Sequence, residues 1–463
     1  IGIVPRASLH SPPLTSPRPP LALPSPPLAL PSQASRMRLA PASLLLLASF
    51  AAAGRLPAPV VSARDGRKRV LMLVCDTGGG HRASAQALEA AVQTLRPDGD
   101  VDVKILDIWT EHGVWPYNKM AAGYPFLCKH PWTWRLAYYS SMFCELPWVL
   151  ETRVRNGAKF KRCISDYSPD LVVSLHPLTQ HLPLHVMRSL DSEGILEKPA
   201  FATVCTDLGS AHPSWFVKGV DACFVPSDAV RRVATRRGLS VSQIKQYGLP
   251  VRRAFWKASE QRGVSEPPAK LKAELGLLPD RKTVLVVGGG DGVGALGKIV
   301  ETTAKQLARD MPNAAQVVAI CGKNKVVARQ LESKKLAWEG VHVEIRGFTS
   351  TISDYMEAAH CLITKAGPGT IAEAAIRGLP TMLSSHLPGQ EAGNVQFVVD
   401  NGFGEYSPRP KKIASTVSAW LQDDEGLRAK SGAALQVAAP HATRLIAVDL
   451  LEMLDAKVVK SAK

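Results

Sequence analysis

The stretch Val70–Ala85, VLMLVCDTGGGHRASA, decides the fold of this chain. Its first six residues are apolar and bulky or β-branched, which is typical of a buried strand. A polar pair and three glycines then break the pattern, and from Arg82 onward the residues favour a helix. A strand, a glycine-rich turn and a helix N-terminus together present backbone N–H donors that attract negative charge. His81 stands at the mouth of this turn, where it either reaches a bound molecule or is an ordinary structural histidine.

The composition is that of a globular protein with a different N-terminus. The 463 residues leave room for two or three domains, and 46% of them are hydrophobic. Residues 1–36 hold ten prolines and no acidic residue, so this segment cannot build a core and is predicted to be disordered. Because the first methionine is Met37, an over-extended reading frame that really starts at Met37 is one interpretation.

A candidate targeting segment begins at Met37. Met37 and Arg38 are followed by the uncharged run LAPASLLLLASFAAAG, which is shorter than the roughly 20 residues that span a membrane. A signal peptide is the first interpretation, and the basic, acid-poor stretch after it is similar to the start of a transit peptide. A plain secretory signal or a short membrane anchor also fits these residues.

The net charge of +16 indicates anionic partners. Six Arg against one Asp in residues 1–66 supply +5 of this charge, which leaves about +11 for the rest of the chain. A basic surface suits nucleic acid, an anionic membrane or a phosphorylated substrate, but no nucleic-acid-binding motif is visible, and we expect no nucleic-acid partner. The eight cysteines form no CxxC pair and no zinc spacing, which predicts free buried thiols in a reducing compartment.

The first half of the chain alternates strand-like runs with loops and helices. Further strands are expected at residues 101–108, 170–175, 201–205 and 222–225, and Ser227 is the expected N-cap of a helix. This order predicts a parallel doubly wound sheet, in which ligands bind outside the carboxyl ends of the strands. Polar residues that follow predicted strands form a candidate cluster there: Asp76, His81, His176, Asp207 and His212.

An aromatic segment follows the second predicted strand. From Trp109 to Trp148 the chain holds eleven aromatic residues, and because Pro and Gly interrupt them we do not expect one long helix. Basic residues, among them Lys119 and Arg135, are interleaved with the rings. Aromatic bodies with basic heads suit the surface of an anionic bilayer, and a loose helical subdomain that packs the rings internally fits equally well.

A second series of strands begins after a polar junction at residues 256–281. Strands are expected at residues 283–287, 317–321, 341–345 and 361–364, with a further short strand after Pro380. The glycine turn at 288–294 is weak as a dinucleotide fingerprint. After a Gly-Pro-Gly turn, Thr370 is expected to cap a helix that carries Glu373 in its first turn; a capping box and a ribose-binding carboxylate are alternatives for Glu373. A loop with Gln390 and Glu391 follows, and residues 409–463 are expected to be helical.

Eight segments closely resemble the monogalactosyldiacylglycerol synthases of plastid envelopes, in this order: DTGGGHRASA, SLHPLTQHLPL, TDLGSAHPSWF, YGLPVR, GGGDGVG, CGKNK, ITKAGPGTIAEAAIRGLP and PGQEAGN. Those enzymes belong to family 28 of the glycosyltransferases, and the resemblance runs from about residue 67 to residue 454. It implies the α/β fold GT-B, in which two Rossmann-like doubly wound domains face each other across a cleft. We expect a leader at 1–66, an acceptor- and membrane-binding domain at 67–250, a UDP-sugar-binding domain at 251–440, and a C-terminal helix at 441–463 that can fold back on the first domain.

The resemblance implies transfer of galactose from UDP-galactose to the free hydroxyl of 1,2-diacylglycerol, with inversion and with neither a metal nor another cofactor. His81 is then the general base that takes the proton from that hydroxyl. The amides of Gly79 and Gly80 would meet the diphosphate or the lipid head group. On the donor side the family's positions fall on a larger set: Arg252, Gly289 and Gly290 at the diphosphate, Phe348 at the uracil, Gly367, Gly369 and Thr370 in the nucleotide turn, Glu373 at the ribose, and Gln390 and Glu391 at the sugar.

The same resemblance implies partners and a location. The aromatic segment would hold the membrane, diacylglycerol and an activating anionic lipid, and the protein would be peripheral to the plastid envelope. The junction at residues 48–51 is similar to the cleavage site of two-part presequences in algae with secondary plastids. The alternatives are a UDP-glucose-dependent diacylglycerol glucosyltransferase, another family 28 lipid glycosyltransferase, and a non-catalytic nucleotide-binding membrane module. The sequence does not indicate the oligomeric state.

Overall fold

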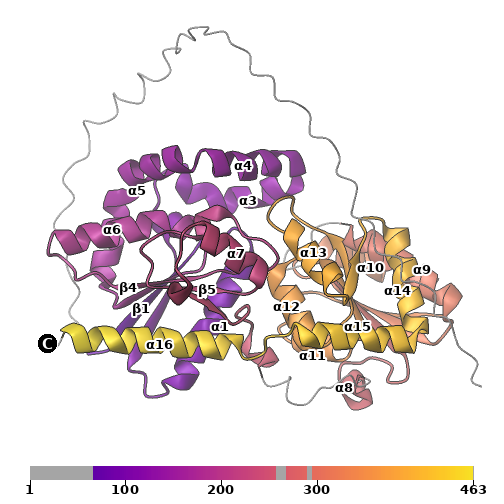
Figure 1. Cartoon of the computed structure of the whole chain (residues 1–463). Coiled ribbons are helices and arrows are strands. Elements are labelled where there is room, and N and C mark those ends of the chain that lie inside the picture. The colour runs from indigo at the N-terminus through magenta and orange to yellow at the C-terminus, as the bar shows by residue number, and fades with distance from the viewer. Residues whose placement is uncertain (1–65, 257–266, 289–294, 462–463) are drawn as a thin grey trace, which may run out of the picture. The chain divides into compact units, whose positions relative to one another are not determined.

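Two six-stranded parallel sheets organise the chain (Figure 1). The structure, a computed structural model, describes residues 66–256, 267–288 and 295–461. The predicted leader up to residue 65 and the predicted diphosphate-binding residues Gly289 and Gly290 lie outside the described residues. Both sheets belong to a single compact unit, Ala58–Lys463.

The first sheet has the strand order β2-β1-β3-β4-β5-β6, with every pair parallel. The predicted strand is β1, an inner strand between β2 and β3: Leu71 and Leu73 face one core, and Val70, Met72 and Val74 face the other. A strand buried on both faces reads as a continuous apolar run, which is why the sequence showed no alternation here. The strands are β1 Lys68–Val74, β2 Val101–Asp107, β3 Leu171–Ser174, β4 Ala200–Val204, β5 Ala222–Val225 and β6 Ile244–Gln246.

The second sheet has the order β12-β11-β10-β7-β8-β9 and is also parallel throughout. With β7 numbered as strand 1 and the sheet read from β9 to β12, this is the Rossmann order 3-2-1-4-5-6. The strands are β7 Lys282–Val287, β8 Ala315–Ile320, β9 His342–Arg346, β10 Cys361–Lys365, β11 Thr381–Ser385 and β12 Gly404–Tyr406. The prediction of two doubly wound sheets is confirmed, while the short strands β6 and β12 were not predicted.

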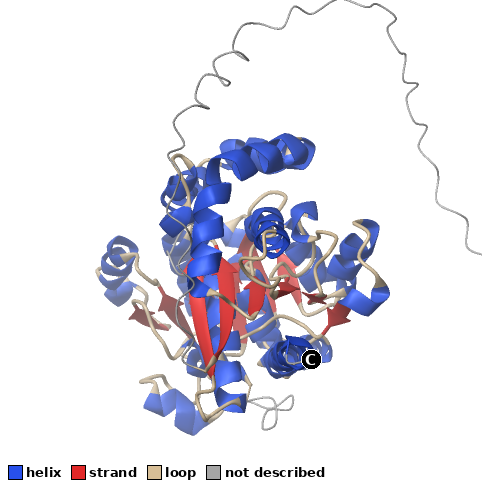
Figure 2. Cartoon of the chain, turned by 90° about the vertical axis from the view of Figure 1, so that its left-hand side faces the viewer, coloured by secondary structure: helices blue, strands red, loops and turns tan. Residues whose placement is uncertain are grey.

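Helices cover the strands from both sides (Figure 2). Those of the first half are α1 Gly79–Leu95, α2 Ile108–His112, α3 Met120–Lys129, α4 Pro131–Phe143, α5 Glu145–Tyr167, α6 His181–Ser192 and α7 Asp228–Arg236. Those of the second half are α8 Ala269–Glu274, α9 Leu296–Asp310, α10 Lys325–Glu332, α11 Ile352–Glu357, α12 Pro368–Ile376, α13 Ala392–Asp400, α14 Pro410–Gln422, α15 Asp424–Gln436 and α16 Ala442–Ser461. Ser227 caps α7 as predicted, since its hydroxyl accepts a hydrogen bond from the Val230 amide. The aromatic segment forms several helices, as expected.

The last helix, α16, packs on the first sheet although it follows the second in sequence (Figure 1). Ile446, Leu450 and Leu454 share a core with β1 and α1. At its far end Asp455 accepts hydrogen bonds from Lys68 at 2.6 Å and Arg96 at 2.5 Å. The chain therefore returns to its first half, and the division at residue 250 stays a prediction.

Two predicted helix starts are wrong. The helix expected from Arg82 begins at Gly79, so Gly79, Gly80 and His81 lie in its first turn. The helix that Thr370 was expected to cap begins at Pro368 with Gly367 as N-cap, so Glu373 lies beyond the first turn and is not part of a capping box. Proline fits the first helical position because it has no N–H to satisfy, and this displaces the cap by three residues.

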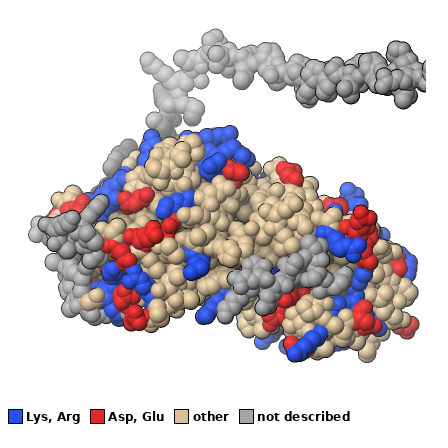
Figure 3. Space-filling view, turned by 60° about the horizontal axis from the view of Figure 1, so that its bottom comes forward, with Lys and Arg blue, Asp and Glu red and all other residues tan. Residues whose placement is uncertain are grey.

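The surface does not form one field of positive charge. On the face shown in Figure 3, basic and acidic side chains are interspersed. Among the described residues, no helix is both long and apolar enough to cross a bilayer.

Candidate functional site

The turn between β1 and α1 holds the first group of predicted residues. Gly78 has a φ of +89°, which a glycine adopts without strain. A Cβ added to Gly78 would lie 3.4 Å from the ring of Tyr124, whereas one on Gly79 or Gly80 would meet open space among the described residues. The first amides of α1 thus follow a residue that has no capping side chain, and they suit an anion or a polar head group.

His81 is 7% exposed and lies against the first sheet. Its Nδ1 is 2.7 Å from the Thr206 hydroxyl, its ring also hydrogen-bonds the backbone of Leu175, and it meets the His176 ring edge-on at 4.5 Å. Burial lowers the pKa of His81 to about 4. The imidazole is therefore neutral at physiological pH, which is the state a general base needs.

The candidate cluster after the strands is largely assembled. Asp207 is 5% exposed and accepts a hydrogen bond of 2.7 Å from the Trp215 indole. Burial raises the pKa of Asp207 to about 7, and Glu391 and the Gln390 amide from the second half act on the same carboxyl. His176 contacts His81, while Asp76 instead pairs with Arg82 at 2.7 Å.

Arg252 and Glu373, both predicted on the donor side, form an ion pair. The guanidinium donates two hydrogen bonds to the carboxylate, 2.7 Å from Nε and 2.5 Å from a terminal nitrogen. Burial raises the pKa of Glu373, and the charge of Arg252 opposes that rise. Arg252 lies over the Phe255 ring at 5.5 Å, and its side chain remains 43% exposed. A half-exposed cation on a buried carboxylate can exchange this partner for a ligand phosphate.

The helix α12, which carries Glu373, begins with the predicted nucleotide turn. Its N-cap is Gly367, and Gly369 and Thr370 are in its first turn. A Cβ on Gly369 would meet open space among the described residues. Phe348, predicted at the uracil, follows β9 and is 71% exposed. These residues all follow strands of one parallel sheet, so they share its carboxyl edge.

The loop after β11 holds Gln390 and Glu391. Glu391 is buried and accepts hydrogen bonds from Lys365 at 2.8 Å and from the Leu387 amide at 2.9 Å. Gln390 reaches Asp207 through its amide, and its Oε1 is buried without a hydrogen-bond partner among the described residues. In this structure Glu391 shapes the loop, and Gln390 is the residue with an acceptor still to satisfy.

Sequence reasoning missed the residues that join the two halves. The Gly209 amide donates to the Asn394 side chain at 2.8 Å, and Asn394 donates in turn to the Ala366 carbonyl at 2.8 Å. A Cβ on Gly209 would lie 1.9 Å from the Gly393 oxygen, so the two backbones touch. Both glycines stood in the quoted motifs, but nothing in the sequence indicates that they meet. The same holds for Thr206 as the partner of His81.

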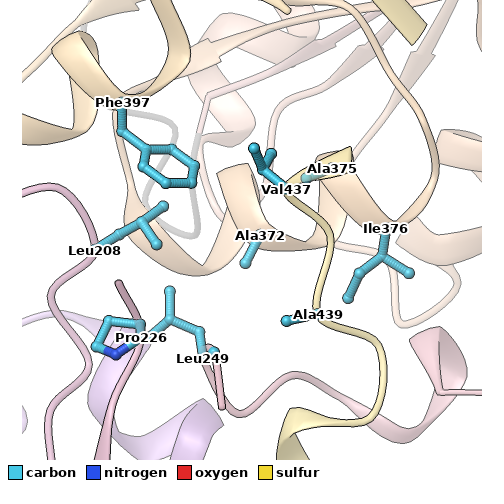
Figure 4. Close-up of a pocket in the computed structure, with 10 residues that line it drawn as sticks. Leu208, Pro226, Leu249, Ala372, Ala375, Ile376, Phe397, Val437 and Ala439 are labelled. Carbon is cyan, nitrogen blue, oxygen red and sulfur yellow. The ribbon is translucent and has the colours of Figure 1, made fainter. Parts of the chain in front are cut away.

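A small cavity of about 30 Å³, lined by apolar residues, lies between the two halves (Figure 4). Leu208, Leu249 and Phe397 line it together with the Ala372 face of α12. None of the predicted site residues lines this cavity, so it is a packing defect beside the site.

The described residues form neither a metal-binding cluster nor a disulfide. Within the described parts of the chain, no three His, Cys, Asp or Glu side chains converge in a metal-binding arrangement. The eight cysteines all lie in the described part of the chain and form no disulfide there.

Two doubly wound sheets that meet through the loops at their carboxyl edges form the GT-B fold that the resemblance implied. MurG from Acinetobacter baumannii has this fold, with a TM-score of 0.52 at 14% identity over 83% of this chain and 99% of MurG. The model of monogalactosyldiacylglycerol (MGDG) synthase matches residues 81–251, and that of the glycosyltransferase family 28 C-terminal domain matches residues 283–444.

The chain belongs to the monogalactosyldiacylglycerol synthase family, which confirms the resemblance of its motifs. It is 43% identical over 404 residues to the chloroplastic monogalactosyldiacylglycerol synthase of Spinacia oleracea, covering 84% of this chain and 73% of that protein. It is 42% identical over 408 residues to monogalactosyldiacylglycerol synthase 1, chloroplastic, of Arabidopsis thaliana, covering 85% and 72%.

Proposed function

We propose that the chain transfers galactose from UDP-galactose to the free hydroxyl of 1,2-diacylglycerol and so makes monogalactosyldiacylglycerol. The observation that carries this function is the identity of 43% to a named synthase over 84% of the chain, a span that includes both sheets. The predicted acceptor and donor residues lie on those two sheets, at edges that touch through Gly209 and Gly393.

On the acceptor side, His81 takes the proton of the diacylglycerol hydroxyl as that oxygen attacks the sugar. Its neutral state favours this role, while its low pKa makes it a weaker base than a free imidazole. Nδ1 is engaged by Thr206, so the incoming hydroxyl either displaces the Thr206 hydroxyl or acts through it. Attack from the face opposite the leaving UDP inverts the anomeric centre.

On the donor side, Arg252 and the N-terminus of α12 meet the diphosphate, and their positive charge stabilises the leaving UDP. Glu373 accepts hydrogen bonds from the ribose once Arg252 turns to the phosphates. Phe348 meets the uracil, and Gln390 and Glu391 meet the sugar. Since these groups offset the charge that develops on UDP, we infer a reaction that needs no metal.

The acceptor comes from a membrane, and α3 and α4 are the surface that meets it. Of the sixteen exposed large apolar side chains in the described residues, ten lie between Trp115 and Val154. Trp132 is 69% exposed and Phe143 is 86% exposed. Rings at such exposure beside the exposed Arg135 suit an anionic bilayer surface. We therefore place the protein peripherally on the plastid envelope, with anionic lipids as partners.

The purified full chain with radiolabelled UDP-galactose or UDP-glucose and diacylglycerol micelles tests this function. We expect label in galactolipid from UDP-galactose at a rate at least about tenfold above that from UDP-glucose, since a polar site discriminates one hydroxyl well. Transfer from UDP-glucose alone would support the glucosyltransferase alternative. Transfer from neither donor would overturn the enzymatic function.

A further inference from the structure

The helix α4 carries two opposite stripes of aromatic residues. Trp132, Leu136, Tyr139 and Phe143 are exposed large side chains and form its outer face. Trp134, Tyr138 and Ser141 follow the same spacing of three and four residues and form its inner face. At 100° per residue the two stripes lie about 200° apart, so one helix presents both faces. The outer face is the one assigned above to the lipid surface.

The inner face contacts the donor loop of the second half. We define the donor loop as residues 387–391, which follow β11. The Trp134 indole donates to the Pro388 carbonyl at 3.1 Å. Gly389 has a φ of +84°, and a Cβ there would lie 2.6 Å from the Tyr138 ring, so the ring lies on the loop backbone. A membrane-facing helix of the first half thus touches the loop that carries Gln390 and Glu391.

The same face also holds the acceptor side. The Ser141 hydroxyl is 3.1 Å from His212 Nε2, and the Tyr138 ring meets the His212 ring edge-on at 5.1 Å. His212 opens the turn whose Trp215 donates to Asp207, and Asp207 is the carboxyl that Gln390 reaches. The contacts therefore run from α4 through both halves and back to the donor loop.

Besides the α4 contacts, the donor loop is held at its C-terminal end, where the Gln390 amide reaches Asp207. Lys365 at the end of β10 binds Glu391 from within the second half. Without α4, Pro388 and Gly389 would lose the contacts with Trp134 and Tyr138, and a glycine in the middle of the loop leaves its backbone free to move. A loop that samples several conformations binds its ligand more weakly, because only the fraction of molecules in the binding-competent conformation can bind.

We propose that Trp134 and Tyr138 are positioning residues for the donor sugar, which hold the donor loop from the inner face of the helix whose outer face meets the lipid. This inference rests on the proposed function, because it takes Gln390 and Glu391 as sugar-binding residues. It makes donor affinity depend on a helix that is itself part of the lipid-binding surface.

The test is Trp134→Phe in the full chain, assayed in detergent micelles with diacylglycerol. Losing one hydrogen bond is expected to raise the KM for UDP-galactose about threefold to tenfold, with kcat within twofold. The matched control is Trp420→Phe. Trp420 lies on α14, and its indole donates a hydrogen bond of 3.3 Å to Glu405. We expect its donor KM to equal that of the wild type. An unchanged KM in Trp134→Phe would overturn the proposal.

A second variant probes the same contact from the other side. Gly389→Ala places a methyl group against the Tyr138 ring and should also raise the donor KM. If both changes act through one contact, the double variant will show less than the product of the two single effects, whereas independent effects would multiply. Multiplying effects, or a KM that Gly389→Ala leaves unchanged, would contradict the shared contact.

Two further measurements separate this inference from the function beneath it. The first is calorimetry of UDP-galactose binding without acceptor. A wild type that binds UDP-galactose but does not transfer it would overturn the proposed function. The affinities of the variants would still decide the inference.

The second measurement is sedimentation with vesicles of anionic and zwitterionic lipid, which tests which face of α4 is affected. Trp132→Phe on the outer face should lower vesicle binding, and Trp134→Phe should leave it unchanged. A loss of vesicle binding in Trp134→Phe equal to that in Trp132→Phe would contradict an inner-face role.

Discussion

At the scale of single residues, His81 is the group on which the chemistry depends. We expect His81→Ala to lower kcat by about 10²- to 10⁴-fold, the usual contribution of a general base. Because His81 is buried against His176, the variant also loses packing, so thermal unfolding must show that it is folded at the assay temperature. His360→Ala is the matched control, since His360 is equally buried but lies on the second sheet beside Thr283. An active His81→Ala variant would exclude the base role.

Asp207 makes a prediction about pH. Its pKa is raised from 3.8 to about 7 in the folded protein, so between these values the folded state holds a proton that the unfolded state has lost. Ionisation therefore favours unfolding as pH rises through this window, and the free energy of unfolding falls. Asp207→Asn cannot titrate. We expect it to gain on the order of 3 kcal/mol relative to the wild type between pH 4 and pH 7.

Denaturant unfolding of both proteins across that pH range measures the difference. Burial lowers the pKa values of His81 and His176, so these histidines lower the free energy of unfolding as pH falls, which is opposite to the effect of Asp207. They are present in both proteins and cancel in the difference, which is why the comparison is made between variants. Parallel stability curves for the two proteins would show that Asp207 does not titrate in this range.

The residues that the sequence could and could not indicate differ in a physical way. His81 and Arg252 could be predicted as site residues because motifs carry them, and their roles stay predictions. Thr206 and Asn394 were not found, because their role depends on contacts with residues 125 and 185 positions away. For Glu373, the local sequence pattern also fits a capping box, and only the fold shows that its partner is Arg252.

At the scale of elements, most strands were predictable, whereas the starts of the helices α1 and α12 were not. A strand buried on both faces is a short apolar run, and β1, β5 and β10 lie within two residues of the predicted bounds. Helix starts depend on which residue adopts the non-helical cap conformation, and glycine and proline compete for that position with Thr370 in α12. The helices α3 and α4 show a different limit. Their aromatic content allowed both a membrane surface and an internal core. One face of α4 is exposed, and we propose that it meets the membrane, while the other face packs on the second half.

At the scale of the whole molecule, the two halves meet so closely at Gly209 and Gly393 that no side chain fits. Neither glycine has a positive φ, so the backbone would accept alanine, and the close approach alone forbids it. A Cβ on Gly393 would lie 2.6 Å from the Gly209 carbonyl group. Gly393→Ala must therefore move the halves apart by a substantial part of an ångström, and with them His81 on one side and Gln390 on the other.

A transfer reaction depends steeply on the separation of its reacting groups, and a shift of about 1 Å can cost about 100-fold in rate. We expect Gly393→Ala to lower kcat/KM at least about tenfold, while each half, with its own core, remains folded. Gly432→Ala in α15 is the matched control, because its Cβ would meet open space among the described residues. Alanine favours helices over glycine by about 1 kcal/mol, so this control should be as active as the wild type and slightly more stable. Steady-state kinetics with both substrates varied, together with thermal unfolding, measures these effects. If Gly393→Ala keeps the kcat/KM of the wild type, the separation of the two halves at this contact does not limit the transfer.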